Sequence, residues 1–554
     1  MVKIWAFGHA SAAINAASCD TVTQIANIAT RICLRKGFHS FKVHGGTHLS
    51  LRGSGGGRAA AAAVIGGGEI AGDGGDAAAK NEGTNPSLRS GSEALLRRLR
   101  FSKLCVADFL TKTAALYSFN CISLLTSHVD NSLNELFQDR SRTGDLCVYV
   151  TSKIDEILFS ELQNHNWRII LVGLGKCNGG ATDKEVLFID TLDGLLITIC
   201  RLIKKEICDK SVLAVGYVMK PSREEDFAKR GAFPSCPTEN GLIFVPLIFE
   251  LPLASQLQGV DVILHKVTDE IISIDTNSSF NFPKGISFTT GMSELQRFLQ
   301  ENSDFCIVDP FSSIYPLLDR LQIQQILLGL QDFGAQCSCR LRAPHFLKVD
   351  NFNDPNLGKQ LLEAKLNFPV IVKPQVACGV ADAHNMALVF KYEDFANLGV
   401  PLPAILQEYV DHCSTIFKFY VLGDKVFHAV KKSMPNACVL LSLSEKTGSA
   451  PLLFNSLKTL PVAREEQLPI GSSKAIKESL DVGLIEKAAN WLRERLGLTI
   501  FGFDVVIQEG SGDHVIVDLN YLPSFKEVPD SDALPAFWDA IRKKYELAKL
   551  SGQH

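Results

Sequence analysis

Short apolar runs alternate with helical patterns through most of the chain, which is typical of α/β domains. From residue 86 to about 210, a basic amphipathic pattern (SEALLRRLRFSKL) precedes apolar runs such as DLCVYVT and WRIILVGLG. We predict a small α/β domain for residues 86–210. None of its aspartates has the i, i+2 spacing of a phosphatase nucleophile after a strand, so we expect a structural or docking role.

Two further units follow in the pattern. Residues 211–330 contain the runs SVLAVGYVM, NGLIFVPLIF, DVILHKVTDE and FCIVDP, separated by helical stretches. This alternation predicts a mostly parallel sheet. Residues 331–547 contain PVIVKP, LQEYV and the lysine-bearing run IFKFYVLGDKVFHAVKK, and they end on the helical pattern PAFWDAIRKKYELAKL.

Alternating positions over residues 501–523 predict a β-hairpin around the turn residues EGSGD. A register centred on Ser511 sets Asp504 opposite Asp518, and the strand period of two places Asn520 on the same face. Two carboxylates and one amide oxygen suit Mg²⁺ that works on a nucleotide. The alternative is that these side chains only cap and solvate the hairpin.

The first 85 residues differ in composition from the rest. They hold the Gly/Ala tract GSGGGRAAAAAVIGGGEIAGDGGDAAAK and almost no acidic residue before Glu69. Such a tract buries too little apolar surface to offset its ordering entropy, so we predict a low-complexity, disordered leader for residues 1–85. An acid-poor, Arg-bearing start fits a plastid transit peptide, and an unusual translated leader fits it equally well.

Charge and cysteine content exclude several classes of protein. Lys and Arg number 56 against 60 Asp and Glu, and the net charge of −4 argues against a chain that coats nucleic acid or membrane. No apolar run reaches the roughly 18 residues of a spanning helix. The 15 cysteines show no C-x-x-C pair, as expected of reduced thiols. We expect a cytoplasmic monomer, or a plastid protein if the leader is a transit peptide, with no nucleic-acid partner.

Several cations stand where ligands would bind. Lys373 ends the strand PVIVKP, where a buried cation requires an anion, and the small-residue loop up to His384 can turn backbone N–H groups toward phosphates. Lys266 ends a predicted strand, the usual place for ligand contacts in an open α/β sheet. The alternatives are that the loop before His384 is an ordinary turn and that His384 is structural. Lys431 and Lys432 could likewise lie on a solvated sheet edge.

No Walker A motif and no protein-kinase motif occurs in the sequence. A strand lysine, a glycine-bearing loop, the connector ILQEYVDH and an Asp…Asp-x-Asn hairpin follow one another in the chain. This order describes the ATP-grasp arrangement, in which the nucleotide lies between two sheets.

Residues 86–547 resemble a plant inositol polyphosphate kinase of the inositol 1,3,4-trisphosphate 5/6-kinase (inositol-tetrakisphosphate 1-kinase) family, from the branch with an extra N-terminal domain. The resemblance rests on VILHKVTD, PVIVKPQVACGVADAHNMALVF, QEYVDH, FKFYVLGD, TIFGFDVV and VIVDLNYLPSFKEVP. It implies an α/β fold with an ATP-grasp core, a haloacid-dehalogenase-like N-terminal domain, ATP and Mg²⁺ as cofactors, and a small-molecule inositol phosphate as substrate. The implied reaction transfers the ATP γ-phosphoryl group to a hydroxyl of an inositol tris- or tetrakisphosphate.

The resemblance also assigns roles to individual residues. The positions that match metal ligands are Asp504, Asp518 and Asn520. The positions that match ATP contacts are Arg320, Lys373, Gln407, Glu408, Tyr409, Val410, Lys418, Ser433 and Ser456. The positions expected on the inositol side are Arg223, Lys266, His384, Lys418, Asn520 and Ser524. The expected catalytic residues are His384, Lys418 and Asp518.

Three departures from the family pattern surround the inositol side. Ser222-Arg223 replaces a Lys-Lys pair, Asp382-Ala383 replaces Lys-Ser, and Ser524 replaces a glycine. The substrate isomer therefore stays open. So do three other activities: a reversible isomerase or phosphatase acting through bound nucleotide, an ATP-grasp ligase, and a non-enzymatic inositol-phosphate-binding scaffold.

Overall fold

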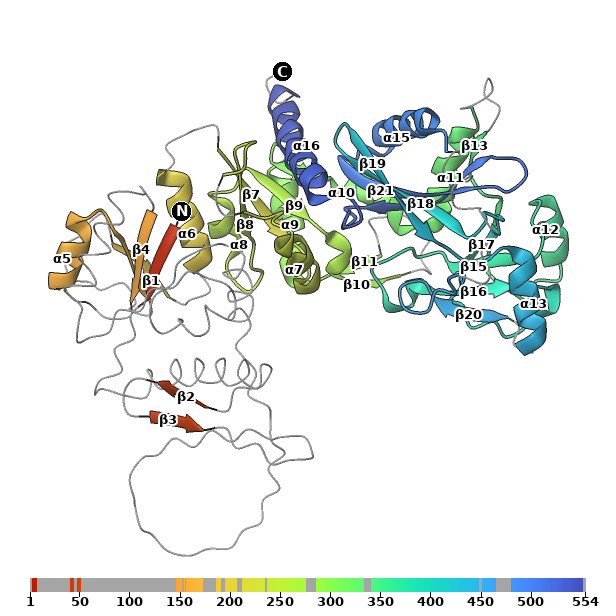
Figure 1. Ribbon diagram of the computed structural model, residues 1–554, viewed down its shortest axis with the longest axis horizontal. Helices are drawn as coiled ribbons and strands as arrows, with labels where there is room; N and C mark the ends of the chain where they lie inside the picture. Colours follow the sequence, from red (N-terminus) through yellow and green to blue (C-terminus); the bar gives the residue numbers. More distant parts are fainter. Residues whose placement is uncertain are drawn as a thin grey trace, which may run out of the picture. The chain divides into compact units, whose positions relative to one another are not determined.

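The computed structural model describes residues 2–6, 40–43, 47–50, 146–151, 154, 156–172, 186–190, 195–206, 212–234, 237–275, 285–332, 340–447, 451–464 and 480–551. The chain divides into two compact units, residues 1–208 and 209–554. Figure 1 labels their helices and strands.

The first unit contains a parallel sheet in the order β1-β4-β5-β6. Its strands are β1 (Val2–Ala6), β4 (Leu146–Thr151), β5 (Arg168–Val172) and β6 (Val186–Ile189), and its helices are α5 (Glu156–Asn164) and α6 (Leu195–Glu206). The apolar runs predicted as strands form β4 and β5, and Trp167 and Ile169 are buried beside them. The unit is therefore α/β, as its pattern indicates.

Three strands lie within the leader that the composition predicts to be disordered. They are β1, β2 (Ser40–Val43) and β3 (Thr47–Ser50); β1 pairs with β4, and β2 pairs with β3. These segments are short β-forming runs such as VKIWA, outside the Gly/Ala tract. For the rest of residues 1–85, the disordered leader stays a prediction. The tract itself, residues 53–80, and the basic pattern at 92–104 lie outside the described residues.

The second unit begins with a parallel sheet in the order β12-β9-β7-β8. Its strands are β7 (Leu213–Val218), β8 (Leu242–Pro246), β9 (Val262–His265) and β12 (Cys306–Val308). Its helices include α7 (Pro221–Lys229), α8 (Leu253–Leu257), α9 (Thr290–Glu301), α10 (Phe311–Ile314) and α11 (Arg320–Leu328). All four predicted runs are strands, and the parallel pairing is confirmed. The antiparallel pair β10 (Ile271–Ile274) and β11 (Ile286–Phe288) was not predicted.

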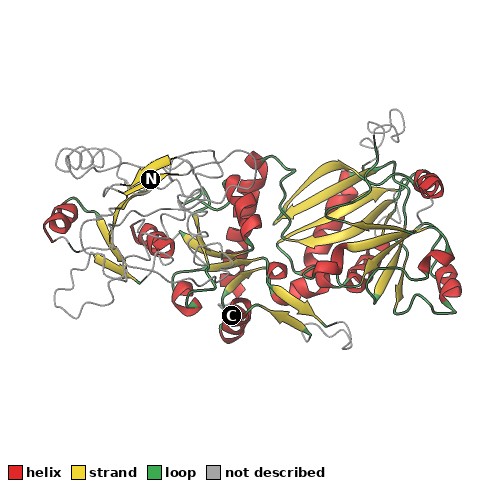
Figure 2. Ribbon diagram, turned by 90° about the horizontal axis from the view of Figure 1, so that it is seen from below, coloured by secondary structure: helices red, strands yellow, loops and turns green. Residues whose placement is uncertain are grey.

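Two five-stranded sheets make up the rest of the second unit, and Figure 2 shows their strands in yellow and the helices in red. The first sheet has the order β14-β17-β15-β16-β20, with β14 (Phe346–Val349), β15 (Val370–Pro374), β16 (Asn385–Val389), β17 (Ala404–Glu408) and β20 (Leu452–Asn455). The second has the order β13-β22-β21-β18-β19, with β13 (Leu341–Arg342), β18 (Thr415–Leu422), β19 (Lys425–Lys432), β21 (Ile500–Ile507) and β22 (His514–Tyr521).

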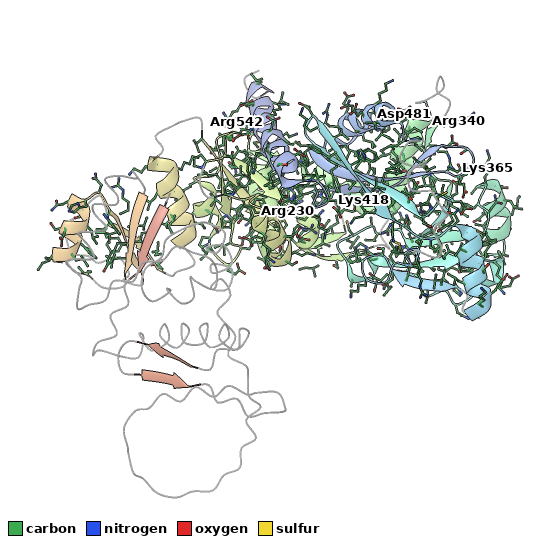
Figure 3. The ribbon with its side chains drawn as sticks, viewed as in Figure 1. Arg230, Arg340, Lys365, Lys418, Asp481 and Arg542 are labelled. Carbon is green, nitrogen blue, oxygen red and sulfur yellow. The ribbon has the colours of Figure 1, made fainter. Side chains whose placement is uncertain are left out.

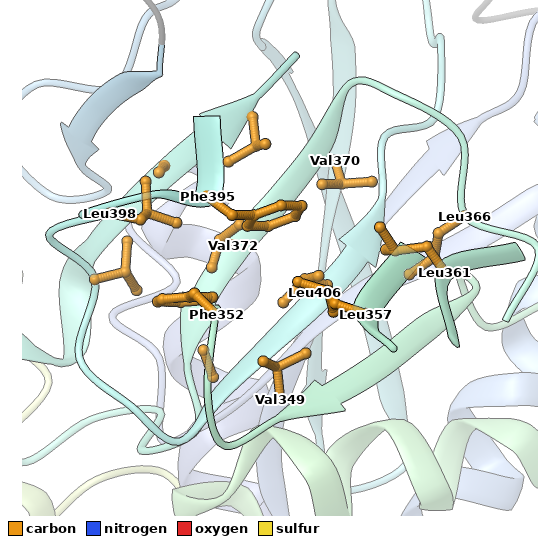
Figure 4. Packing of buried hydrophobic residues seen from close by; sticks show 14 residues of the cluster. Val349, Phe352, Leu357, Leu361, Leu366, Val370, Val372, Phe395, Leu398 and Leu406 are labelled. Carbon is orange, nitrogen blue, oxygen red and sulfur yellow. The ribbon is translucent and has the colours of Figure 1, made fainter. Parts of the chain in front are cut away.

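Strand alternation gives the first of these sheets two apolar faces. Val370 and Val372 pack with Leu357 and Leu361 of α12 (Leu357–Glu363) in the cluster of Figure 4. Ile371, between those two valines, packs on the opposite face with Leu440 of α13 (Ala437–Thr447). Successive residues of a strand point to opposite faces of the sheet, so one apolar run packs against a helix on each face.

The second sheet separates apolar from polar side chains. Phe417, Phe419, Phe501 and Phe503 are fully buried, and the rings of Phe419 and Phe503 stack at 5.1 Å. Their neighbours in the strands, including Lys418 and Asp504, point to the opposite face. That polar face carries the candidate chemistry described below.

Two long helices complete the unit. Helix α15 (Val482–Leu496) is capped by Asp481 at its start and ends at Gly497, whose φ of +67° suits glycine. Helix α16 (Asp530–Ser551) contacts β12 and β18, and its Phe537 packs among Phe227, Phe233 and Phe525. It begins five residues before the predicted run, with Asp530 and Asp532 in its first turn.

Candidate functional site

One row of side chains crosses three strands of the second sheet. Lys418 of β18 pairs with Asp504 of β21, which in turn pairs with Asp518 of β22. Asn520 lies one row further on and pairs with Gly502. The predicted opposition of Asp504 and Asp518 is therefore confirmed, and the three oxygen-bearing side chains lie on the polar face of the sheet.

The hairpin reaches this register through a bulge. Asp504 pairs with Asp518, but the next residue, Val505, pairs with Ile516, so Val517 is the extra residue. A register centred on Ser511 thus holds only for the pairs farther from the turn than the bulge, from Asp504↔Asp518 to Phe501↔Tyr521. The turn between the strands uses Gly510 and Gly512, with φ of 87° and 73°.

The electrostatics of this row leave negative charge to be compensated. Lys418 Nζ donates to Asp504 Oδ2 at 2.7 Å, and Asn520 Nδ2 donates to Asp518 Oδ2 at 3.3 Å. Burial and the neighbouring Asp518 raise the pKa of Asp504, although Lys418 opposes them. Burial alone would lower the pKa of Lys418, but Asp504 and Asp518 outweigh it and raise that pKa. Lys418 therefore stays protonated at neutral pH.

The residues of this row fit a hard divalent cation. In the part of the chain that the structure describes, no group of three or more His, Cys, Asp or Glu side chains could hold a metal. The proposed set has two carboxylates, Asp504 and Asp518, completed by the amide oxygen of Asn520. Burial, and after it the like charge of Asp518, disfavours the ionised form of Asp504. Mg²⁺ accepts such oxygen donors while it keeps water and phosphate ligands.

Lys373 brings a cation from the other five-stranded sheet toward this row. Its Nζ donates to Gln407 Oε1 at 2.8 Å, and Gln407 is buried. Burial lowers the pKa of Lys373 to about 8, while Asp518 and Asp504 act in the opposite direction. Side chains from both sheets are thus within electrostatic reach of one another, as an ATP-grasp site requires.

Arg320 makes contacts that differ from those expected of an ATP phosphate ligand. Its guanidinium is buried, and Nη1 donates to the carbonyls of Pro374 (2.6 Å) and Val376 (2.8 Å). Nη2 donates to the carbonyls of Ala377 (3.2 Å) and Ala383 (3.1 Å). Arg320 therefore shapes the small-residue loop, and its direct contact with ATP stays a prediction.

His384 closes that loop and is linked to Ser456. His384 Nδ1 lies 3.1 Å from Ser456 Oγ, and the Ser456 N–H donates to the His384 carbonyl at 3.0 Å. Burial and the nearby Arg320 lower the pKa of His384, so the imidazole is neutral near pH 7. The structure thus joins a predicted substrate residue to a predicted ATP residue.

Side chains of the connector between β17 and β18 form hydrogen bonds or pack against other side chains of the protein. Glu408 accepts two hydrogen bonds from Arg342, at 2.8 and 2.9 Å, and the hydroxyl of Tyr409 donates to the carbonyl of Pro435. Val410 packs in an apolar cluster with Val506 and Val515. These side chains fix the connector in place, so any hydrogen bonds to a base must come from the backbone.

Ser433 was predicted to contact ATP and is buried just after β19. Its N–H donates to the carbonyl of Ser414 at 2.7 Å, and its carbonyl accepts from the N–H of Ala463 at 2.9 Å. The backbone of Ser433 is therefore fixed next to the connector, and its contact with ATP stays a prediction.

Lys266, expected on the inositol side, contacts Tyr521 of β22. Lys266 Nζ donates to the Tyr521 carbonyl and lies 3.8 Å from the centre of the Tyr521 ring. Burial and the nearby Arg223 lower the pKa of Lys266 to about 7. Arg223 Nε donates to Asp269 Oδ2 at 3.0 Å. These contacts place Lys266 next to the strand that carries Asn520, with Arg223 in electrostatic reach of Lys266.

Ser524 is held through its backbone by a residue that the sequence did not indicate. Arg230, at the end of α7, donates from Nη1 to the Ser524 carbonyl at 2.5 Å and from Nε to Asp530 at 2.6 Å. Figure 3 labels Arg230 and Lys418. Arg230 is 294 positions from Ser524 and 300 from Asp530 in the sequence, so no local pattern could have found it.

Comparisons with known proteins agree with this geometry. The family described as "Inositol 1,3,4-trisphosphate 5/6-kinase ATP-grasp domain" matches residues 336–538, and the family described as "ITPK4, N-terminal HAD-like domain" matches residues 76–205. The chain is 60% identical over 487 residues to inositol-tetrakisphosphate 1-kinase 6 of Oryza sativa subsp. indica, covering 86% of this chain and 88% of the rice protein. The chain belongs to the inositol-tetrakisphosphate 1-kinase family.

More distant proteins were also found. Inositol-tetrakisphosphate 1-kinase 1 of Zea mays is 27% identical over 334 residues, covering 59% of this chain and 89% of that protein. Among solved structures, the VanG D-Ala:D-Ser ligase of Enterococcus faecalis has a TM-score of 0.37 and 13% identity, covering 60% of this chain and 99% of that one. The predicted ATP-grasp core behind an N-terminal haloacid-dehalogenase-like domain is confirmed by the two family matches.

Among the described helices of this inositol-tetrakisphosphate 1-kinase family member, none is both long enough and apolar enough to cross a bilayer.

Proposed function

We propose that the chain transfers the γ-phosphoryl group of ATP to a hydroxyl of an inositol tris- or tetrakisphosphate. The observation that carries the proposal is the row of Lys418, Asp504 and Asp518, with Lys373 of the other sheet in electrostatic reach. Phosphoryl transfer is catalysed mainly by positioning and by stabilising charge on the phosphoryl oxygens. This row combines the carboxylates and the cations that such a reaction needs.

Asp504, Asp518 and Asn520 are the residues that would hold Mg²⁺. When bound there, the ion supplies Lewis-acid stabilisation of the charge on the phosphate oxygens. Lys418, hydrogen-bonded to Asp504, orients that carboxylate and adds a fixed positive charge of its own. As a protonated cation it acts in this proposal as an electrostatic stabiliser.

The nucleotide is held by residues of both sheets in this proposal. Lys373, whose pKa of about 8 leaves it largely protonated at neutral pH, binds a phosphate of ATP. The backbone of the connector, residues 407–410, takes the adenine, and Ser433 and Ser456 line the same side. Arg320 is a positioning residue, because it fixes the loop whose N–H groups turn toward the phosphates.

The inositol phosphate is met by cations that converge on one region. Each phosphate group carries about −1.5 to −2 charges, and removing it from water is costly unless opposite charges replace the solvent. Lys266, Lys418 and Arg223 supply those charges, while Asn520 and Ser524 contribute polar contacts. His384 is neutral and uses Nδ1 toward Ser456, so its Nε2 is left for the ring hydroxyl that attacks.

A product-resolved assay across inositol tris- and tetrakisphosphates, with ATP labelled in its γ-phosphate, tests the proposal. We expect the label on the ring of at least one isomer. Label released only as inorganic phosphate, whatever the isomer, would exclude the kinase reaction. Release that requires an amine acceptor would instead identify a ligase, and conversion of one labelled isomer to another in the presence of ADP would identify a reversible isomerase.

A further inference from the structure

We infer that Glu527 is a specificity-determining residue, whose carboxylate disfavours an inositol phosphate group at the ring position that faces it. This inference rests on the proposed function and extends it to the choice of isomer. Glu527 lies in the segment after Asn520, seven residues beyond it in the sequence. It is not among the residues that the sequence assigned to the site.

Two hydrogen bonds fix the Glu527 carboxylate over the polar face of the second sheet. The Tyr420 hydroxyl donates to Oε2 at 2.6 Å, and Lys431 Nζ donates to Oε1. Tyr420 is buried, and the Glu527 side chain is 17% exposed, against 40% for Lys431. The carboxylate is therefore held in one place but remains in contact with solvent, where a ligand can meet it.

The strand registers place this carboxylate next to Lys418. Ile416 pairs with Lys431, Lys418 pairs with Ala429, and Tyr420 lies one row beyond Lys418. In an antiparallel pair, directly opposed residues share a face, so Lys418, Tyr420 and Lys431 all point to the polar side. Lys431 and Tyr420, the two hydrogen-bond donors to Glu527, lie in the cross-strand pairs on either side of the Lys418–Ala429 pair.

The negative charge of Glu527 acts electrostatically on Lys418. Burial would raise its pKa, but the hydrogen bonds from Lys431 and Tyr420 outweigh burial and lower it, so the carboxylate is ionised at neutral pH. Glu527 is also among the charges that raise the pKa of Lys418. Glu527 therefore adds a negative charge to the surroundings of a cation that is proposed to bind phosphate.

Such a carboxylate can select against phosphate and still accept a hydroxyl. A phosphate group beside it would meet a like charge, whereas a free hydroxyl can donate a hydrogen bond to it. Glu527 also pairs with Lys431 and so removes one cation from the ligand's reach. Both effects favour isomers with a free hydroxyl at the position that faces Glu527.

Two substitutions in this one ion pair distinguish selectivity from a structural role. Glu527→Gln removes the negative charge and frees Lys431, so we expect kcat/KM to rise roughly fivefold for those isomers that carry a phosphate at this position. Lys431→Met leaves the Glu527 charge unpaired, so kcat/KM for the same isomers should fall by a similar factor. Tyr420→Phe removes a hydrogen bond without a change of charge and serves as the matched control, with the isomer ranking of the wild type.

The assay measures kcat/KM for each isomer of an inositol tris- and tetrakisphosphate panel in the full-length protein, beside the thermal unfolding midpoint of each variant. Opposite shifts for the same isomers support the inference. Shifts in the same direction in both ion-pair variants, or one common factor for every isomer, would overturn it and assign Glu527 a structural role. If the wild type phosphorylates no isomer, the proposed function fails instead, so the two failures are distinguishable.

Discussion

At the scale of single residues, the site depends on side chains whose neighbours change their protonation. Lys266 is the clearest case, because burial and Arg223 lower its pKa to about 7, although Cys378 and Asp269 act in the opposite direction. A cation that loses its proton near neutral pH makes inositol phosphate binding depend on pH.

We predict that the affinity of the nucleotide-free protein for an inositol phosphate falls as pH rises through about 7. Lys266 is charged below that pH and neutral above it, so one proton must be taken up on binding at higher pH, and Kd rises by up to about tenfold per pH unit. Isothermal titration calorimetry from about pH 6 to pH 8.5 measures this dependence.

The variant Lys266→Arg provides the control for that titration. A guanidinium stays charged throughout this range, so the variant reports only the titration of the ligand's own phosphates. If Kd for the inositol phosphate depends on pH in the same way in the wild type and in Lys266→Arg, then Lys266 does not titrate in the site. Equal weakening of ATP and inositol phosphate binding in Lys266→Ala would count against its place on the inositol side.

At the scale of elements, the loop between β15 and β16 is held from two sides. The guanidinium of Arg320 donates to three carbonyls of this loop and to that of Pro374 at the end of β15, and the backbone N–H of Arg320 donates to the Gln375 carbonyl at 2.8 Å. On the other side, Gly379 approaches Ile271 of β10 so closely that a Cβ would lie 2.7 Å from Ile271 Cδ1. The backbone of Gly379, with φ of +90°, also favours glycine.

We predict that Gly379→Ala lowers kcat/KM for ATP by at least roughly tenfold, because backbone strain and the clash with Ile271 displace the loop. Gly399→Ala is the matched control, since a Cβ there meets only Leu453 Cδ1 at 3.9 Å, an ordinary contact. Steady-state kinetics and thermal unfolding of both variants test this. Wild-type kinetics in a folded Gly379→Ala protein would show that the loop does not contribute to nucleotide binding.

The sequence predicted elements and their order better than contacts between them. The alternation over residues 501–523 was enough to oppose Asp504 and Asp518, because strand period and turn residues are local properties. The bulge at Val517 was missed, since nothing in the local pattern marks an extra residue. The contacts of Arg320 and Arg230 were missed for another reason: each cation meets backbone carbonyls far away in sequence, and carbonyls carry no residue-specific signal.

At the scale of the whole molecule, the residues proposed for the site all belong to one compact unit. They extend from Arg223 to Ser524, inside the unit of residues 209–554. That unit has its own aromatic core, in which Phe537 of α16 packs with Phe227 and Phe233. Residues 1–208 form the other unit.

We therefore predict that residues 209–554, expressed alone, fold cooperatively and keep the kcat of the full chain. All the side chains proposed to bind ATP, metal and inositol phosphate are present in this fragment, and its core is complete. Circular dichroism and the product-resolved assay measure the two properties. A fragment that folds but transfers no phosphate would mean that the N-terminal unit completes the site.

The central claim is that Asp504, Asp518 and Asn520 support phosphoryl transfer from ATP to an inositol hydroxyl. It is tested most directly by the rate at which γ-label from ATP enters the inositol ring in Asp518→Ala, beside Asp539→Asn as an exposed carboxylate control on α16. We predict a loss of at least roughly 10²-fold in Asp518→Ala, the scale for one preorganised charge-stabilising group, and no loss in the control. Transfer at the wild-type rate in folded Asp518→Ala protein would contradict the claim.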